Sequence, residues 1–432
     1  MARMKRDPKL RRRLARRGAI ALLWVALSAS ANAGAAVRPV SDVPGLQAAI
    51  ASADPGDEIV LAAGTYQVGA NLGITRSGTQ AAPIRLRAAT PHGALLRFNI
   101  VEGFRVAASD WRFEDLVIEG VCAIDDNCEH AFHLVAAADR TVLRNNRVRD
   151  FNAPVKGNGE PVGPGGSYVF PDDVLIERNH FYGTRARDTA NPVTMIDVVG
   201  GRRWIVRGNL IYDFQKGLGD GISYGAFLKG NSRNGLFERN LVMCARNFAG
   251  GTRIGLSLGG GGTAPQFCED ASCATEHQDG ILRNNLVVNC SDVGIYLNRA
   301  QATRVDHNTL HATSGIDVRF ATSSATLRNN ALTGAIRNRD GGTSVQSGNL
   351  AGVAVATMQA WFVDPANGDF RAIDVAALAD QGVGGTGVVD DYCGDDRDDG
   401  FNDIGAVEYD GEADCDTRPD APADLILVDG FE

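Results

Sequence analysis

Short runs of alternating apolar and polar residues, each interrupted by an asparagine, recur through the middle of this 432-residue chain. Alternation of this kind indicates β-strands. A segment that returns every 22 to 45 residues, roughly, indicates a repeat protein. The seven segments are TVLRNNRVRDF (141–151), VLIERNHFYGT (174–184), WIVRGNLIYDF (204–214), GLFERNLVMCA (235–245), GILRNNLVVNC (280–290), TRVDHNTLHAT (303–313) and ATLRNNALTGA (325–335).

The asparagines mark the corner between the two strands of each repeat. Strands this short are not stable alone, but stacked coils pair with one another and share one core. Asparagine tolerates the left-handed backbone of a sharp corner, and stacked asparagines can bond in a ladder. The alternative, a β-sandwich with scattered asparagines, does not account for seven members in register. They are Asn146, Asn179, Asn209, Asn240, Asn285, Asn308 and Asn330, with Asp115 at the same place in an imperfect earlier repeat.

The pattern changes at both ends of the repeats. Residues 42–53 (DVPGLQAAIASA) predict one amphipathic helix with Pro44 near its start, which would cover the open end of the first coil. We therefore expect an N-terminal cap at 34–57, stacked coils at 58–350, a C-terminal irregular cap at 351–410 and an acidic, proline-containing tail at 411–432.

The helix, the strand DEIVLAAGTY that follows it and the asparagine-marked repeats together resemble the right-handed parallel β-helix of the pectin-lyase-like superfamily. The resemblance covers most of the chain and implies an all-β solenoid. Pectate lyases, polygalacturonases, chondroitinase- and alginate-type lyases, epimerases and tailspikes share this scaffold, so the fold alone does not give the function.

The first 33 residues resemble a secretory signal peptide. They combine nine basic residues and one acidic residue with the apolar run AIALLWVALSASA and a small-residue cleavage site at Ala31–Ala33. The whole chain has a formal net charge of −9, which leaves the remainder near −17. We expect a secreted, periplasmic or cell-surface protein that is a monomer, has no membrane span and does not bind nucleic acid.

Eight cysteines suit an oxidising compartment. Local spacing suggests the pairs Cys122–Cys128, Cys268–Cys273 and Cys393–Cys415, and the matching corners of successive repeats suggest Cys244–Cys290. Eight cysteines allow 105 connectivities, and a zinc site is the alternative that these spacings do not favour.

A second set of strands precedes the asparagine repeats and carries the candidate binding residues. These strands lie in the segments HAFHLV, TMIDVV, YGAFLKG, IGLSLGG, GIYLNR and GIDVRF. If their aliphatic residues point inward, a row of polar and aromatic groups points outward. Neighbouring members of the row are then about 4.8 Å apart, the spacing of adjacent strands. Gly259–Gly262 would leave room for a ligand. The alternative is a solvated sheet face. The candidates for binding an acidic polysaccharide are His133, Asp197, Tyr296, Asn298, Asp317 and Arg319.

Lys229, in GAFLKGNSRNGLFERN, is the candidate base. The surrounding pattern is similar to the chondroitinase B and alginate lyase family, which implies a lysine base for β-elimination. The acidic pair that the resemblance implies as calcium ligands is matched here by Ile222 and Tyr224, and the implied arginine of the next coil by Gly259. Arg253 is then the candidate cation, although it lies roughly 20 Å from Lys229 along the strand unless a bulge intervenes. A structural or ligand-binding lysine is the alternative.

Acidic clusters offer further candidates. Asp125–Asp126 and Asp172–Asp173 could serve hydrolysis by paired carboxylates, and the run at 393–403 could bind Ca²⁺ through oxygen ligands. We therefore expect a polysaccharide lyase for a uronate-containing glycan, with no certain cofactor other than a candidate Ca²⁺. The alternative is a non-catalytic glycan-binding or cell-surface β-helix.

Overall fold

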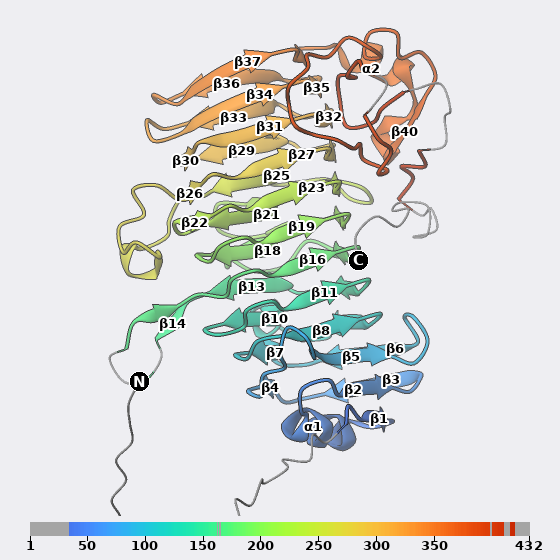
Figure 1. The fold of residues 1–432 in the computed structure, drawn as a ribbon, viewed down its shortest axis with the longest axis vertical. Coiled ribbons are helices and arrows are strands. Elements are labelled where there is room, and N and C mark those ends of the chain that lie inside the picture. The colour runs from blue at the N-terminus through green and yellow to red at the C-terminus, as the bar shows by residue number, and fades with distance from the viewer. Residues whose placement is uncertain (1–33, 162, 164–165, 398–399, 410–414, 420–432) are drawn as a thin grey trace, which may run out of the picture. The chain divides into compact units, whose positions relative to one another are not determined.

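Three parallel sheets are built by stacked coils of the chain, and each coil adds one strand to each sheet (Figure 1). The computed structural model describes residues 34–161, 163, 166–397, 400–409 and 415–419. The signal peptide expected at 1–33 and most of the tail expected at 411–432 lie outside the described residues. The stacked parallel strands are the arrangement that the sequence predicts.

Each coil runs from sheet A to sheet B to sheet C. Sheet A contains β1 (Val37–Val40), β2 (Glu58–Leu61), β5 (Ile84–Ala88), β8 (Trp111–Glu114), β11 (Val142–Arg144), β16 (Leu175–Glu177), β19 (Ile205–Arg207), β23 (Leu236–Glu238), β27 (Ile281–Arg283), β31 (Thr303–Asp306), β34 (Ser324–Arg328) and β37 (Thr343–Ser347). Sheet B contains β3 (Gly64–Val68), β6 (Ala94–Phe98), β9 (Val117–Gly120), β12 (Arg147–Arg149), β17 (His180–Tyr182), β20 (Leu210–Tyr212), β24 (Leu241–Met243), β28 (Leu286–Val288), β32 (Thr309–His311), β35 (Ala331–Leu332) and β38 (Leu350–Ala351).

Sheet C positions the candidate site. It contains β4 (Leu72–Ile74), β7 (Glu102–Val106), β10 (His130–Val135), β13 (Val155–Asn158), β18 (Val193–Val199), β21 (Ile222–Lys229), β25 (Thr252–Gly259), β29 (Ile295–Asn298), β33 (Gly315–Arg319) and β36 (Ala335–Arg339). Short strands lie outside the three sheets. They are the parallel set β22 (Ser232–Arg233), β26 (His277–Gln278) and β30 (Ala300–Gln301), and the antiparallel pairs β14 (Glu160–Pro161) with β15 (Tyr168–Val169) and β39 (Phe362–Asp364) with β40 (Asp369–Ala372).

The core is a column of apolar side chains inside the coil. On sheet A, Leu143, Ile176, Val206, Phe237 and Leu282 stack in register, and none of them is exposed. Burying one such side chain contributes about 1.5–3 kcal/mol. The strands of the three sheets have only two to eight residues. Stacking of like residues from coil to coil therefore holds each strand in place.

The predicted asparagine ladder is present at the corner between sheets A and B. From Asn179 onward, each ladder Oδ1 accepts hydrogen bonds of 2.8–3.1 Å from the backbone N–H and the Nδ2 of the ladder asparagine one coil earlier. Each Nδ2 also donates to a backbone carbonyl. The structure adds one rung, Asn349, that the repeats did not reveal.

The expectation that the ladder asparagine itself is left-handed is wrong. The residue before it takes the positive φ, as at Asn145 (φ 52°) and Arg178 (φ 55°). Asp115 (φ 63°) belongs to this turning position, and Leu116 takes the ladder position and donates its N–H to Asn146 Oδ1. The turning residue makes the corner, which leaves the next side chain free to point into the stack.

The charges on the outer face of sheet A neutralise one another. Arg144 pairs with Glu114 and Glu177, and Arg207 pairs with Glu177 and Glu238. The glutamates of these pairs are buried and the arginines are half-buried. They leave these charges committed to neighbours in the next coil.

The two ends of the stack are closed differently. Helix α1 (Val43–Ser52) confirms the predicted N-terminal helix; it buries Leu46, Ala49 and Ile50, and Asp42 caps it by accepting from Gly45 N at 2.7 Å. In the last coil, three polar residues occupy positions that are apolar in the coil before. Asn338, Ser344 and Gln346 lie in register with Val318, Ala325 and Leu327, and they bond to one another.

The C-terminal segment packs along the outer face of sheet B. Helix α2 (Val355–Trp361), β39 and β40 bring Met358, Phe362 and Phe370 into one apolar cluster with Leu241 and Met243. Thr417 belongs to this packed segment, because its hydroxyl accepts from Phe370 N and donates to Gly368 O. With lengths of ten and seven residues, neither α-helix of the described part is long enough to span a bilayer.

All four suggested disulfide pairs are formed, and no described cysteine is free. Cys244–Cys290 links adjacent coils, with the Cα atoms 4.8 Å apart. Since the chain forms disulfides at these positions, a cysteine-based zinc site is not compatible with this state of the thiols.

Candidate active site

Two rows of side chains project outward from sheet C, because the residues between them lie in the core. The first row is His133, Lys156, Asp197, Phe227, Ser257, Tyr296 and Asp317. The second row lies two residues further along the strands and contains Lys229, Gly259, Asn298 and Arg319. Seven of the eight residues that the sequence singled out lie in these rows.

The sequence predicts an exposed row of polar side chains, but in the structure several of these side chains are buried. Asp197, Tyr296, Asn298 and Asp317 are all at most 7% exposed. Asp317 is fully committed to ion pairs with Arg337 and Arg339, 2.6 Å each.

Arg319 is also held within the protein. Its guanidinium pairs with Asp340 and donates to the Tyr296 hydroxyl at 3.1 Å. Because Asp317, Tyr296 and Arg319 satisfy one another or near neighbours, the end of the row beyond Asn298 is the less available part for a ligand.

Lys229 is the last residue of β21, and its ammonium lacks an ionic partner. Nζ lies 4.4 Å from the centroid of the Phe227 ring and makes no hydrogen bond or salt bridge with the described residues. The other two lysines of the described chain are paired, Lys156 with Asp197 and Lys216 with Asp220. Lys229 is therefore the lysine whose amine is available to a ligand.

Burial is the main cause that lowers the pKa of Lys229 below the ordinary lysine value. The negative charge of Asp197 opposes that shift, Lys156 adds to it, and Glu276 opposes it. A lowered pKa increases the fraction of neutral amine near neutral pH, and neutral amine is the form that can take a proton.

Lys156 and Asp197 form the charged pair nearest to this amine. Lys156 Nζ donates to Asp197 Oδ1 at 2.7 Å. Burial would raise the pKa of Asp197, but the two lysines outweigh burial and the pKa is lowered. The sequence pattern does not predict Lys156 as a site residue. Two features of the sequence point to it: lysine is rare in this chain, and Lys156 lies one coil before Asp197.

The sequence predicts room for a ligand at Gly259–Gly262, and the structure leaves it at Gly261 and Gly262 but not at Gly259 and Gly260. A Cβ on Gly260 would lie 3.0 Å from Lys229 Cδ, and one on Gly259 would lie 1.9 Å from the Asn298 carbonyl oxygen. The glycine backbone therefore packs against Lys229 itself and supplies part of its burial.

Two loops leave sheet C on the side where its strands end, and both are visible in Figure 1. One is the hairpin β14–β15, which follows β13, and the other lies between β25 and β26 and contains the Cys268–Cys273 disulfide. In the stack, β21 lies between these two coils. The end of β21 that carries Lys229 is thus bracketed by the longest loops of the solenoid.

His133 extends the site toward the N-terminal coils. Its Nδ1 lies 2.8 Å from Glu102 Oε1 and its Nε2 lies 2.7 Å from Asn158 Oδ1. The hydrogen bond with His133 is the main cause that lowers the pKa of Glu102. Burial lowers the pKa of the neighbouring His130 to about 4, so that ring is neutral near pH 7.

Arg253 is not brought to Lys229. It pairs with Ser223 in the register of β21 and β25, six residues before Lys229. Its guanidinium is 1% exposed and donates to Cys244 O, to Gly250 O at 2.9 Å and to Gln215 Oε1 at 2.6 Å. These contacts are those of a buried arginine that holds a corner together next to the Cys244–Cys290 disulfide.

The positions at which the resemblance implies calcium ligands do not fit a metal ion. Ile222 and Tyr224 join Ile254, Val293 and Tyr296 in a small apolar cluster on the outer face of sheet C. None of these side chains offers a carboxylate, so these positions do not provide the oxygen ligands that calcium requires.

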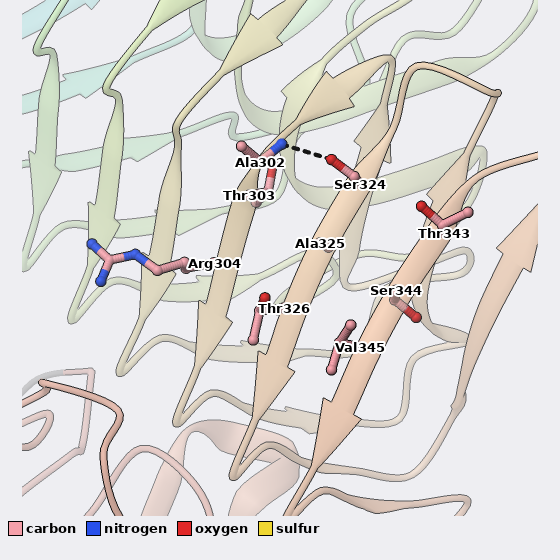
Figure 2. Close-up of a pocket in the computed structure, with 9 residues that line it drawn as sticks. All are labelled: Ala302, Thr303, Arg304, Ser324, Ala325, Thr326, Thr343, Ser344 and Val345. Carbon is pink, nitrogen blue, oxygen red and sulfur yellow. Dashed lines mark hydrogen bonds between the residues drawn. The ribbon is translucent and has the colours of Figure 1, made fainter.

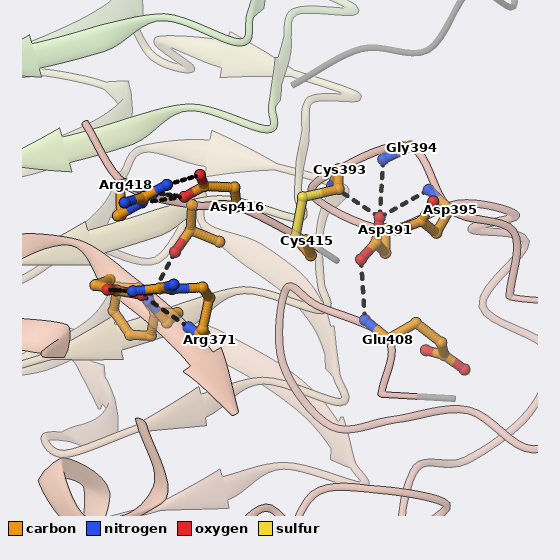
Figure 3. The surroundings of a disulfide bond; sticks show 12 residues. Arg371, Asp391, Cys393, Gly394, Asp395, Glu408, Cys415, Asp416 and Arg418 are labelled. Atoms are coloured by element: carbon orange, nitrogen blue, oxygen red, sulfur yellow. Dashed lines mark hydrogen bonds and ion pairs between the residues drawn. A yellow bond between two sulfur atoms is a disulfide. The ribbon is translucent and has the colours of Figure 1, made fainter. Parts of the chain in front are cut away.

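The acidic run near residue 393 is organised by backbone hydrogen bonds (Figure 3). Asp391 Oδ1 accepts from the N–H groups of Cys393, Gly394 and Asp395 at 2.7–2.9 Å, and its Oδ2 accepts from Glu408 N at 3.0 Å. The carboxylate is thereby occupied in shaping the loop beside the Cys393–Cys415 disulfide.

The earlier aspartate pairs are also bound to the protein. Asp125 accepts from both terminal nitrogens of Arg185 at 2.7 Å, and Asp173 pairs with Arg203. Neither pair presents two free carboxylates.

A shallow depression of about 370 Å³ lies on the outer face of sheet A across β31, β34 and β37 (Figure 2). It is lined mainly by small hydroxyl and aliphatic side chains, and Arg304 is its one titratable lining residue. Without a base or an acid, this depression cannot perform proton transfer.

Comparison with known proteins agrees with the fold. Residues 112–351, more than half of the chain, match the family model described as "Right handed beta helix region". The chain belongs to the right-handed β-helix family. For this right-handed β-helix, the prediction of fold class is confirmed. No curated protein sequence matches it.

One solved structure shows the same scaffold at low identity. A pectate lyase, Pel9A, is 14% identical with a TM-score of 0.60, covering 86% of this chain and 96% of that one. This match shows the fold of the right-handed β-helix alone. An alginate lyase from Paenibacillus sp. str. FPU-7 is 16% identical with a TM-score of 0.48, covering 72% and 99%. A rhamnogalacturonan lyase is 13% identical with a TM-score of 0.47, covering 72% and 87%.

Proposed function

We propose that this right-handed β-helix is a secreted polysaccharide lyase that cleaves a uronate-containing glycan by β-elimination, with Lys229 as the base. The observation that carries the proposal is the unpaired, half-buried amine of Lys229 on the outer face of sheet C. The pectate lyase Pel9A, which covers most of the chain with the same fold, supports this class of chemistry.

In the proposed reaction, the neutral amine of Lys229 takes the proton from the carbon next to the uronate carboxyl. The electron pair of that C–H bond forms a carbon–carbon double bond, and the glycosidic C–O bond breaks with its electrons on the leaving oxygen, which water protonates. Negative charge develops on the carboxylate before the bond breaks, so a nearby cation lowers the barrier.

Lys156 is the residue that we assign to this electrostatic role. It lies two coils from Lys229 and donates to Asp197, which lies between them in the stack. Because Lys229 must be neutral to act as the base, Lys156 is the lysine that contributes positive charge toward the uronate carboxylate.

The test is the ultraviolet absorbance of the unsaturated product, measured on alginate, pectate and glycosaminoglycan at several pH values, with added Ca²⁺ and with a chelator. We expect product from at least one glycan without added Ca²⁺, and Lys229→Ala should lower the rate about 10²–10⁴-fold. Lys216→Ala is the matched control because Lys216 is paired with Asp220 away from the rows. A folded protein that is inactive on every glycan would refute the lyase proposal.

A non-catalytic glycan-binding protein is the second candidate, favoured by one observation. The position that would carry the family's arginine is Gly259, and Arg253 is buried elsewhere. This candidate predicts retention of an acidic glycan by the wild type with no unsaturated product, and equal retention by Lys229→Ala.

A further inference from the structure

The peptide that follows Lys229 is held from three sides. Lys229 O accepts from Gly200 N at 2.7 Å, Gly230 N donates to Glu276 Oε2 at 2.8 Å, and Gly230 O accepts from Glu269 N at 2.9 Å. Gly230 has a φ of 72°, which favours glycine. The loop between β25 and β26 therefore folds back over the end of β21 and fixes the backbone from which Lys229 projects.

Glu276 is the charged group of this clamp, and half of its carboxyl is unused. Its side chain is 1% exposed, and Oε1 has no hydrogen-bond partner among the described residues. A buried carboxyl oxygen without a partner is costly, and the bond to Gly230 N alone uses only one of the two oxygens.

The charges around the two groups are few. Asp197, Lys156 and Glu276 act on Lys229. Lys229, Arg299 and Asp270 act on Glu276. Burial raises the pKa of Glu276 while it lowers that of Lys229, so both groups are pushed toward their neutral forms.

We propose that Glu276 is the positioning residue of Lys229: it fixes the backbone behind that side chain, and its charge adds to that of Asp197 in favouring the protonated ammonium. The inference deepens the proposed lyase function and rests on it for its catalytic meaning. Glu276 does not touch substrate, since it is buried, and acts through Lys229. Its negative charge favours the protonated amine, and loss of that charge favours the neutral amine.

Glu276→Gln separates the two roles, because the amide oxygen can still accept from Gly230 N while the charge is gone. Glu276→Ala removes both. Glu269→Gln is the matched control, since it removes a charge from the same loop but its partner is Arg202. A thermal melt of each variant reports whether the fold is intact.

The readout is the NMR titration of lysine amines carrying ¹³C-methyl groups, and the Lys229 signal is assigned by its disappearance in Lys229→Arg. We expect the Lys229 midpoint to fall by at least about half a pH unit in Glu276→Gln and to stay in place in Glu269→Gln. An unchanged midpoint in folded Glu276→Gln overturns the proposal. The titration needs no substrate, so a protein without lyase activity but with the shifted midpoint would refute the proposed function and leave this inference standing.

If the protein is a lyase, the acidic limb of its pH–rate profile should move to lower pH by the same amount in Glu276→Gln. A role limited to folding would lower the rate at every pH without moving that limb.

Discussion

Asp197 accepts a hydrogen bond from Lys156 at 2.7 Å and lies in the same outward row, one coil before the strand that ends in Lys229. The carboxylate is thus shared by two cations, of which it bonds one. The amine of Lys229 therefore has no hydrogen-bonded partner, but the negative charge of Asp197 favours its protonated form. The protonation of Lys229 thus depends on Asp197, which need not touch a substrate.

Asp197→Asn should move the acidic limb of the pH–rate profile to lower pH, because the charge that favours protonated Lys229 is removed. The free energy of unfolding should fall by about 1–3 kcal/mol, since Lys156 loses a charged acceptor. Asp317→Asn is the matched control: it lies in the same row, but its partners are Arg337 and Arg339. Equal pH profiles for the wild type and Asp197→Asn would contradict the assignment.

Gly260→Ala should lower the turnover rate by about 10- to 100-fold with little change in the melting temperature. The added Cβ would lie 3.0 Å from Lys229 Cδ and would displace the side chain, and a misplacement of about 1 Å can cost 10²-fold. Gly261→Ala is the control, since the nearest atom to its Cβ would be Asn298 Nδ2 at 3.9 Å. Similar rates for the two variants would show that the position of Lys229 does not depend on this glycine.

Asn240→Ala should lower the free energy of unfolding by at least about 3 kcal/mol. The substitution removes the acceptor of Asn209 N and Nδ2 and the donor to Val206 O. The terminal rung Asn349→Ala should cost only about 1 kcal/mol, because that residue is half-buried and bonds to a single neighbouring coil. Chemical denaturation measures both values, and equal losses would mean that the ladder does not act as a continuous array.

Acid should destabilise the fold through histidines that are buried in the neutral form. His277 Nδ1 bonds to Ser232 Oγ at 2.7 Å, Nε2 accepts from Gly235 N at 3.3 Å, and burial lowers the pKa to about 3. The unfolded chain binds the proton at about pH 6.5, so this contribution to stability is present above that pH and is lost as the pH falls toward 3.

At pH 5 the loss should be about 2 kcal/mol for this histidine. Denaturation at pH 7 and pH 5 gives the total change, and the His277 ring signal in NMR should not titrate between those values. Titration of that ring near pH 6.5 in the folded protein would contradict the prediction.

The fold could be predicted because its information is local and repeated. The ladder asparagines and the inward aliphatic residues follow from periodicity, and the outward rows follow from strand alternation. The pattern places the turn at the asparagine itself, but the left-handed residue is the one before it, such as Arg178, because the asparagine side chain is needed in the ladder.

The environment of the candidate site depends on contacts between distant segments, which periodicity does not contain. The burial of Lys229 by Gly260 and the clamp at Glu276 come from a loop that folds back across the preceding coil. For the same reason the sequence does not predict the buried partners of Arg253. Its positive charge makes it a candidate cation for the site, but its contacts hold it elsewhere.

The asparagine ladder keeps bonds of the same length whether 22 or 45 residues separate its rungs. One corner of the coil is therefore fixed, and the opposite side can gain or lose some twenty residues without disturbing the layers above and below. The long insertion between Asn240 and Asn285 that covers Lys229 is such a module. The surroundings of Lys229 and the stability of the scaffold are therefore set by different parts of the coil and can vary independently of each other.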